Sequence, residues 1–165
     1  EDIEKLETRP CNTVVENCDA RKMRLESESI DAIITSPPYL NNIDYTKVYA
    51  IENWFVGQPE PSIRSYIGLD DPEKLAENYS RDMEFVLEEM FRVCKPGANV
   101  GIVLANAYFP REEKIVDVDI ELARIAEKTG FKAKEILVLN KRYALERRTI
   151  QKGVLRESLI VLEKG

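Results

Sequence analysis

The sequence predicts an α/β domain with a mainly parallel sheet, because short apolar runs alternate with segments of helical periodicity. The chain has 165 residues, the size of one ordinary domain, so residues 1–165 are treated as a single domain. Its residues are 44% apolar and 33% charged, which suits a packed core under a charged surface. No apolar run reaches the roughly 18 residues of a membrane span, and no signal-peptide pattern opens the chain. We therefore expect a cytoplasmic protein without a membrane partner.

The first predicted elements are two strands and a helix. Residues 12–17 (NTVVEN) are predicted to form a short strand, followed by a polar loop at residues 18–20. Residues 30–35 (IDAIIT) are predicted to form a buried strand, which the next two prolines end because they cannot donate ladder hydrogen bonds. A helix is expected over residues 45–56, and a loop over 57–69. Four aromatic residues of this helix are expected to pack rather than to bind a base, although Tyr45 stays open: Tyr45, Tyr49, Trp54 and Phe55.

Two longer helices are predicted in the second half of the chain. Asp71 and Pro72 provide a cap and a first-turn proline for a helix whose apolar stripe extends over residues 75–94. A Lys-Pro-Gly sequence at 95–97 ends it. An amphipathic helix over Val118–Thr129 is expected to end at Gly130.

Three strands accompany these helices. Residues 99–105 (NVGIVLA) are almost entirely apolar, as expected for a strand covered on both faces. Residues 131–140 and 158–163 are the last two predicted strands. The strand at 99–105 is followed by Asn106, for which a turn-capping role is favoured over a place in a site.

Several kinds of site are excluded by composition. There is no histidine, so histidine bases, histidine triads and histidine-ligated zinc cannot occur in this chain. The three cysteines, Cys11, Cys18 and Cys94, are odd in number and have no CxxC spacing. Buried reduced thiols are therefore expected, and no metal site.

The charge is unevenly distributed. The net charge is -6, yet residues 141–165 carry seven basic and three acidic side chains. Six of the basic residues fall in the predicted connection between the last two strands: Lys141, Arg142, Arg147, Arg148, Lys152 and Arg156. This cluster is either a solvated loop or a patch that contacts the phosphates of a nucleic acid.

The most informative motif is Thr-Ser-Pro-Pro-Tyr at residues 35–39, at the carboxyl end of a predicted strand. Ligands of open α/β sheets bind at that end of the strands, although a proline-terminated strand with a packed tyrosine would show the same residues. The motif resembles the catalytic motif of the DNA amino-methyltransferases, which methylate the exocyclic nitrogen of cytosine or adenine. Its serine is most similar to the cytosine-N4 branch.

The resemblance extends over residues 12–164 in the order of the family. Residues 18–20 and 29–34 are similar to its acidic loop and the strand leading to the motif, and residues 91–104 to its next helix–turn–strand. Residues 156–164 are similar to its closing strand. This resemblance implies a Rossmann-like, S-adenosylmethionine-dependent methyltransferase fold with strand order 3-2-1-4-5-7-6 and an antiparallel last strand.

The resemblance also implies roles for individual residues. The Ser36 side chain and the Pro37 carbonyl would accept hydrogen bonds from the target amino group, with Pro37 and Pro38 fixing the backbone. Tyr39 would stack on a base flipped out of the DNA. Asp19, with Ala20 beside it, would bind the adenine amino group of S-adenosyl-L-methionine; a turn aspartate that accepts nearby backbone amides is the alternative.

One expected motif is missing. The family's glycine-rich cofactor loop is absent, because none of the seven glycines has its spacing: Gly57, Gly68, Gly97, Gly101, Gly130, Gly153 and Gly165. The first βαβ unit is therefore expected to be lacking. The chain would be a fragment of a DNA methyltransferase, one piece of a split or permuted enzyme that needs a second chain, or a non-catalytic nucleic-acid-binding subunit. An RNA or adenine-N6 methyltransferase is the alternative enzyme.

Overall fold

The protein is described by a computed structural model over residues 12–40, 50–56, 72–109, 113–146 and 150–165. In chain order, the elements are β1 (Ile30–Thr35), α2 (Ala50–Val56), α3 (Pro72–Val93), β2 (Cys94–Ala105), β3 (Ala107–Phe109), β4 (Lys114–Val116), α4 (Val118–Thr129), β5 (Phe131–Glu146) and β6 (Ile150–Lys164). The predicted α/β class is confirmed. None of the helices described here is long and apolar enough to cross a membrane.

Four strands form the main sheet in the order β1-β2-β6-β5, and β3 and β4 form a separate hairpin. β1 is parallel to β2, whereas β6 is antiparallel to both β2 and β5. Three of the four strands therefore point the same way, and the last strand is inserted between two of them against that direction. This is the 4-5-7-6 part of the expected strand order, so that part of the prediction is confirmed.

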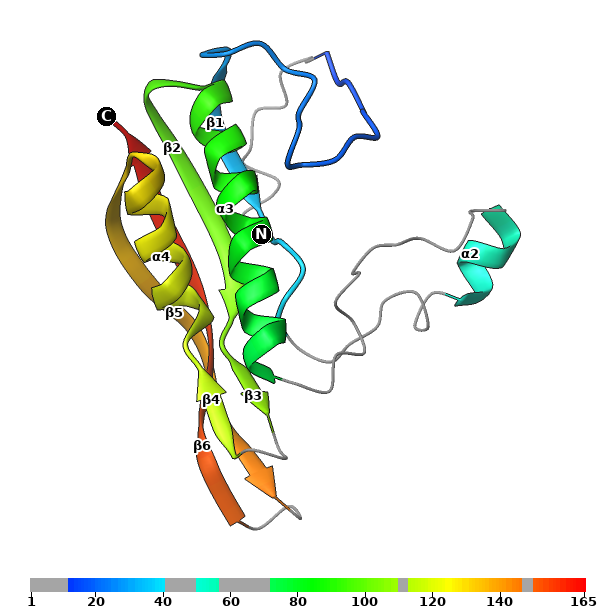
Figure 1. The fold of residues 1–165 in the computed structure, drawn as a ribbon, viewed down its shortest axis with the longest axis vertical. Coiled ribbons are helices and arrows are strands. Elements are labelled where there is room, and N and C mark those ends of the chain that lie inside the picture. The colour runs from blue at the N-terminus through cyan, green and yellow to red at the C-terminus, as the bar shows by residue number, and fades with distance from the viewer. Residues whose placement is uncertain (1–11, 41–49, 57–71, 110–112, 147–149) are drawn as a thin grey trace, which may run out of the picture.

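The core lies between the sheet and two helices. Figure 1 shows α3 and α4 side by side on one face of the sheet. Both predicted helices are confirmed, and the side chains fully buried between them and the sheet include Leu87, Ile102, Leu104, Leu122 and Ile160. Burying a side chain of this kind contributes about 1.5–3 kcal/mol each.

Gly130 ends α4 as expected. Its φ is 110°, and its backbone N–H donates to the carbonyls of Ala126 and Glu127. A Cβ at this position would come within 2.9 Å of the Phe91 ring, so both the left-handed backbone and the close packing require glycine.

The opposite face of the sheet is open among the residues described. Strand register places Ile34 beside Gly101 and Val161, and Val103 beside Leu159 and Leu137. Ile34 is 87% exposed and Leu137 is 43% exposed. The prediction that residues 99–105 are covered on both faces is therefore wrong, because among the described helices α3 and α4 cover only one. Residues 30–35 form the predicted strand, but none of them is buried.

The predicted strand at residues 12–17 is also wrong. These residues have no regular structure, and Val14 and Val15 are 80% and 92% exposed. An isolated strand is not stable without a hydrogen-bonded neighbour, and this segment pairs with none of the described strands. Cys18 is exposed as well, contrary to expectation, whereas Cys94 is buried.

The predicted helix over 45–56 is observed as α2 from Ala50 onward, and residues 45–49 and 57–69 lie outside the described residues. Trp54 and Phe55 pack edge to face with ring centroids 5.1 Å apart. Both stay largely exposed, so the two rings pack against each other and not in the core.

The connection between the last two strands is shorter than predicted. β5 and β6 continue as a hairpin in which Lys141 pairs with Arg156 and Arg142 with Leu155. Charged side chains are compatible with this ladder because β5 is an edge strand and Lys141 is exposed. Arg147 and Arg148 lie outside the described residues.

A buried ionic network joins α4 to β6. Asp119, in the first turn of α4, is fully buried and accepts two hydrogen bonds from the Arg156 guanidinium, at 2.7 and 2.8 Å. The Ser158 hydroxyl donates to the same carboxylate at 2.8 Å. Burial raises the pKa of Asp119, but the hydrogen bonds from Arg156 and Ser158 outweigh burial and leave that pKa below its ordinary value.

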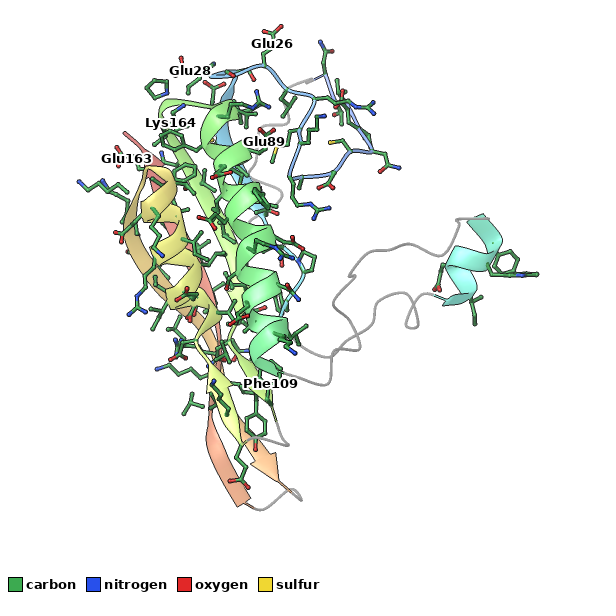
Figure 2. All side chains as sticks on the ribbon, in the orientation of Figure 1. Glu26, Glu28, Glu89, Phe109, Glu163 and Lys164 are labelled. Carbon is green, nitrogen blue, oxygen red and sulfur yellow. The ribbon has the colours of Figure 1, made fainter. Side chains whose placement is uncertain are left out.

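A second polar contact fixes the far end of β6. The Lys164 ammonium donates to the carbonyls of Phe91 and Cys94, at 2.9 and 2.8 Å, and thereby caps the C-terminal end of α3. Figure 2 shows Lys164 near Glu28 at this end of the sheet. Together the two contacts hold β6 in a fixed register beneath both helices.

We predict that Asp119→Ala lowers the free energy of unfolding by about 3 kcal/mol, because Arg156 and Ser158 would lose their buried acceptor and Arg156 would keep only the more exposed Asp117. Urea titration measures this. The matched control is Asp31→Ala, whose exposed pair with Lys95 should contribute less than about 1 kcal/mol. Folding lowers the pKa of Asp119, so its contribution to the free energy of unfolding is fully present above the ordinary pKa of 3.8. That contribution is lost as the pH falls below 3.8 and through the lowered pKa of the folded protein. Equal stabilities of Asp119→Ala and Asp31→Ala would contradict this role.

Candidate active site

The Thr-Ser-Pro-Pro-Tyr motif lies where the sequence places it, directly after β1. Pro37 and Leu40 are buried, and Leu40 is only 3% exposed. Ser36, before Pro37, and Pro38, after it, are exposed. The loop is thus anchored in the core at two positions while the Ser36 hydroxyl stays accessible. Prolines at 37 and 38 further restrict the backbone of this segment.

Tyr39 joins the motif to the other side of the sheet. Its ring packs against the core, and its hydroxyl donates to Glu157 Oε1 at 2.8 Å. The Ser36 hydroxyl is directed to the same Tyr39 oxygen at 3.5 Å. Glu157 belongs to β6, so the motif contacts a strand that is 118 residues away in sequence.

A cleft of about 330 Å³ opens beside this contact. It lies at the carboxyl end of β2, and nine residues from four strands, the β1 loop and the β2–β3 junction line it: Tyr39, Ala105, Asn106, Ala107, Tyr108, Asn140, Leu155, Arg156 and Glu157. The position agrees with the expectation that ligands bind at the carboxyl ends of the strands.

Asn106 lines the cleft and also joins two strands. Its side-chain oxygen accepts from the Arg156 backbone N–H at 2.8 Å, and its amide nitrogen donates to the Val154 carbonyl at 3.2 Å. The favoured expectation of a turn cap was therefore wrong. Asn106 bridges the end of β2 to β6 and fixes that wall of the cleft.

Sequence reasoning missed Glu157, Asn140 and Tyr108. Strand alternation places Arg156 and Ser158 on the helix-covered face and Glu157 on the opposite one, but only the register brings Glu157 opposite Ala105 and Asn140. A local pattern in the sequence contains no such register.

Asp19 and Ala20 are exposed and lie in a turn. The Asp19 carboxylate accepts from the Arg21 backbone N–H at 2.9 Å and from the Arg21 guanidinium at 2.8 Å. The side-chain hydrogen bond from Arg21 is the main cause that lowers the pKa of Asp19 to about 2. These are the contacts of a turn aspartate, so the predicted cofactor role of Asp19 and Ala20 stays a prediction. Within the described part of the chain, Asp19 forms no hydrogen bond with Ser36 or Tyr39.

The basic residues differ in what they contact. Lys141 is exposed and follows Asn140 of the cleft, whereas Arg156, from the same basic run, is occupied by Asp119 and Asp117. Arg156 is therefore a structural residue. Within the described ranges, no group of cysteines and carboxylates is arranged to hold a metal ion.

Comparison with known proteins gives relatives of one kind. No family model matches the chain. The type II methyltransferase M.BsoBI of Geobacillus stearothermophilus is 27% identical over 203 residues, covering 86% of this chain and 40% of its own length. The chain is similar to this type II methyltransferase over most of its own length. M.AvaI of Anabaena variabilis is 29% identical over 162 residues, covering 69% of this chain and 33% of its own length. The resemblance based on residues 35–39 is thus confirmed.

Solved structures show the same fold. A protein of Thermus thermophilus assigned as a DNA modification methylase superposes with a TM-score of 0.55 at 17% identity, over 89% of this chain and 52% of its own. Its complex with S-adenosyl-L-methionine gives 0.55 at 16% identity. The fold of this chain is the Rossmann-like methyltransferase fold. The chain spans 40% or less of the length of these curated relatives and about half of the length of the Thermus protein.

Proposed function

We propose that this chain is the catalytic part of a DNA methyltransferase that transfers a methyl group from S-adenosylmethionine to an exocyclic amino nitrogen, with cytosine-N4 favoured over adenine-N6. The observation that carries the proposal is the accessible Ser36 hydroxyl beside Tyr39 at the mouth of a cleft, after a strand end anchored by Pro37 and Leu40. The relatives are type II methyltransferases.

The chemistry suits these residues. The lone pair of an exocyclic amino nitrogen is delocalised into the base, which makes the nitrogen a poor nucleophile. Acceptors for its protons, supplied by Ser36 Oγ and the Pro37 carbonyl, favour localisation of the lone pair during attack on the methyl group. Tyr39 would stack on the flipped base, and the fixed backbone lowers the cost of orienting these groups.

S-adenosylmethionine would supply the methyl group at this site. Asp19 fits the role of a ligand for its adenine amino group, because the carboxylate is exposed on a turn and accepts hydrogen bonds. Ala20 would lie beside the adenine. Binding would require the Asp19 carboxylate to share or exchange its bonds to Arg21.

The rest of the cofactor site would come from outside the described elements. Further strands and helices would pack on three surfaces: the open sheet face with Ile34 and Leu137, the edge of β1 that no described strand pairs with, and the exposed Val14 and Val15. The greater length of the relatives supports this. We propose that this additional part, in the same or a second chain, carries the glycine-rich loop.

DNA is the proposed partner, and the β5–β6 hairpin is its proposed contact. Lys141 is exposed next to Asn140 of the cleft, and Arg142, Arg147 and Arg148 follow it in sequence. Basic side chains beside the base cleft would neutralise phosphates of the DNA strand that holds the flipped base.

We predict that the native gene, expressed in a host free of DNA methylation, produces N4-methylcytosine in the host DNA, measured by mass spectrometry of digested nucleosides. Ser36→Ala should lower methyl transfer about a hundredfold, because one oriented acceptor contributes about 3 kcal/mol to the barrier. Ser29→Ala, at the other end of β1, is the matched control. If the product is N6-methyladenine, the protein is an adenine-N6 methyltransferase, and if RNA is methylated, it is an RNA methyltransferase. If no nucleic acid is methylated, the chain belongs to a non-catalytic subunit.

We predict that the isolated 165-residue chain binds S-adenosylmethionine weakly or not at all, because it lacks the glycine-rich loop. Isothermal titration calorimetry of this chain, beside the product of the native gene, measures the difference. Tight binding at one equivalent to the chain alone would show that another of its segments replaces the loop.

We predict that Arg147→Ala/Arg148→Ala weakens binding to duplexes of all sequences alike and reduces the salt slope by roughly two units, about 0.9 per phosphate contact. The matched control is Arg124→Ala/Lys128→Ala, which removes the same charge from exposed positions of α4. If DNA affinity and its salt dependence are unchanged in Arg147→Ala/Arg148→Ala, these basic residues are solvent-exposed charges that do not contact phosphates.

A further inference from the structure

Three oxygen atoms form a continuous chain at the edge of the cleft. Ser36 Oγ lies 3.5 Å from the Tyr39 hydroxyl, which lies 2.8 Å from Glu157 Oε1. The first distance is long for an O–H···O bond, as is common in ligand-free catalytic sites that close around substrate. Glu157 is the only charged group of the three.

The position of the Glu157 carboxylate is imposed by its neighbours in β6. Arg156 and Ser158 both donate to the buried Asp119 carboxylate on the helix-covered face. Because side chains alternate along a strand, this contact directs Glu157 to the opposite face, where it lines the cleft. The backbone N–H of Arg156 is held as well, by Asn106.

The carboxylate determines which way the hydrogen bonds run. A carboxylate accepts hydrogen bonds and donates none, so the Tyr39 hydroxyl donates its single proton to Glu157. The Tyr39 oxygen is then an acceptor for the Ser36 proton. With its proton so directed, the exposed Ser36 Oγ has its lone pairs available to accept from a substrate.

We propose that Glu157 is a positioning residue that, through Tyr39, makes Ser36 an acceptor for the amino group of the target base. This rests on the proposed function and extends it to a residue outside the motif. A serine hydroxyl can donate or accept, and only the accepting orientation helps the amino lone pair to localise. No proton is transferred along the chain; Glu157 acts on orientation alone, and it also holds the Tyr39 ring at the edge of the cleft.

The test compares single-turnover and steady-state methyl transfer by the purified product of the native gene, using methylation-free genomic DNA as substrate. In Glu157→Gln, the new amide can donate to the Tyr39 oxygen and reverse the chain. In Tyr39→Phe, the ring that stacks on the base is kept and only the hydroxyl is lost. We expect kcat to fall about tenfold in each, with KM for DNA nearly unchanged.

The double variant separates positioning from independent effects. Glu157→Gln acts only through the Tyr39 hydroxyl, so Glu157→Gln/Tyr39→Phe should be no slower than Tyr39→Phe alone. The matched control is Glu163→Gln, which removes the same charge from the same strand at its other end, where Glu163 pairs with Lys134. Circular dichroism and urea titration establish that each variant is folded.

Three results would overturn the positioning role. These are a wild-type kcat in Tyr39→Phe, a Glu157→Gln variant that behaves like Glu163→Gln, and multiplicative losses in the double variant. If the wild-type product methylates no DNA, the proposed function itself fails, and the positioning role fails with it. The two failures are distinguished by the wild-type rate.

Discussion

The bidentate contact between Asp119 and Arg156 is the interaction on which the rest of the structure depends. It is buried, it is completed by Ser158, and it joins the first turn of α4 to the central antiparallel strand. β6 is hydrogen-bonded to both β2 and β5, so a shift of β6 would disturb every long pairing of the sheet except that of β1. Removing Asp119 leaves the partly buried Arg156 guanidinium with only the more exposed Asp117 and leaves the buried Ser158 hydroxyl without this acceptor, which is the reason for the expected cost.

The same contact connects the core to the candidate site. With Arg156 and Ser158 fixed on one face, the residue between them is presented to the cleft on the other. The motif loop is held independently, by Pro37 and Leu40 in the core. The Tyr39–Glu157 hydrogen bond is the point where these two rigid supports meet, and both partners can therefore be held in one geometry before substrate binds.

Among the described residues, helices cover one face of the sheet and leave the other open, which explains which sequence predictions were wrong. The sequence predicts a buried strand at residues 30–35 and a strand covered on both faces at residues 99–105. Both segments are strands, but Ile34 is exposed because no described helix lies over it. Residues 12–17 have strand-like composition, but none of the described strands pairs with them. The composition fits a larger fold than the described elements provide, in agreement with the greater length of the relatives.

The sequence by itself determined the elements whose signals are local. Pro72 at the start of α3, Gly130 at the end of α4 and the diproline after β1 act within a few residues, and Ser36 and Tyr39 are close enough in the chain to be recognised as one motif. Only the tertiary structure decided that Glu157 lies beside Tyr39, that Arg156 of the basic run pairs with the buried Asp119, and that Asn106 bridges two strands. These three features depend on strand register and on helix-to-strand contacts between residues far apart in sequence. Alternation along one strand gives the face on which a side chain lies, but not which residue of the adjacent strand lies beside it.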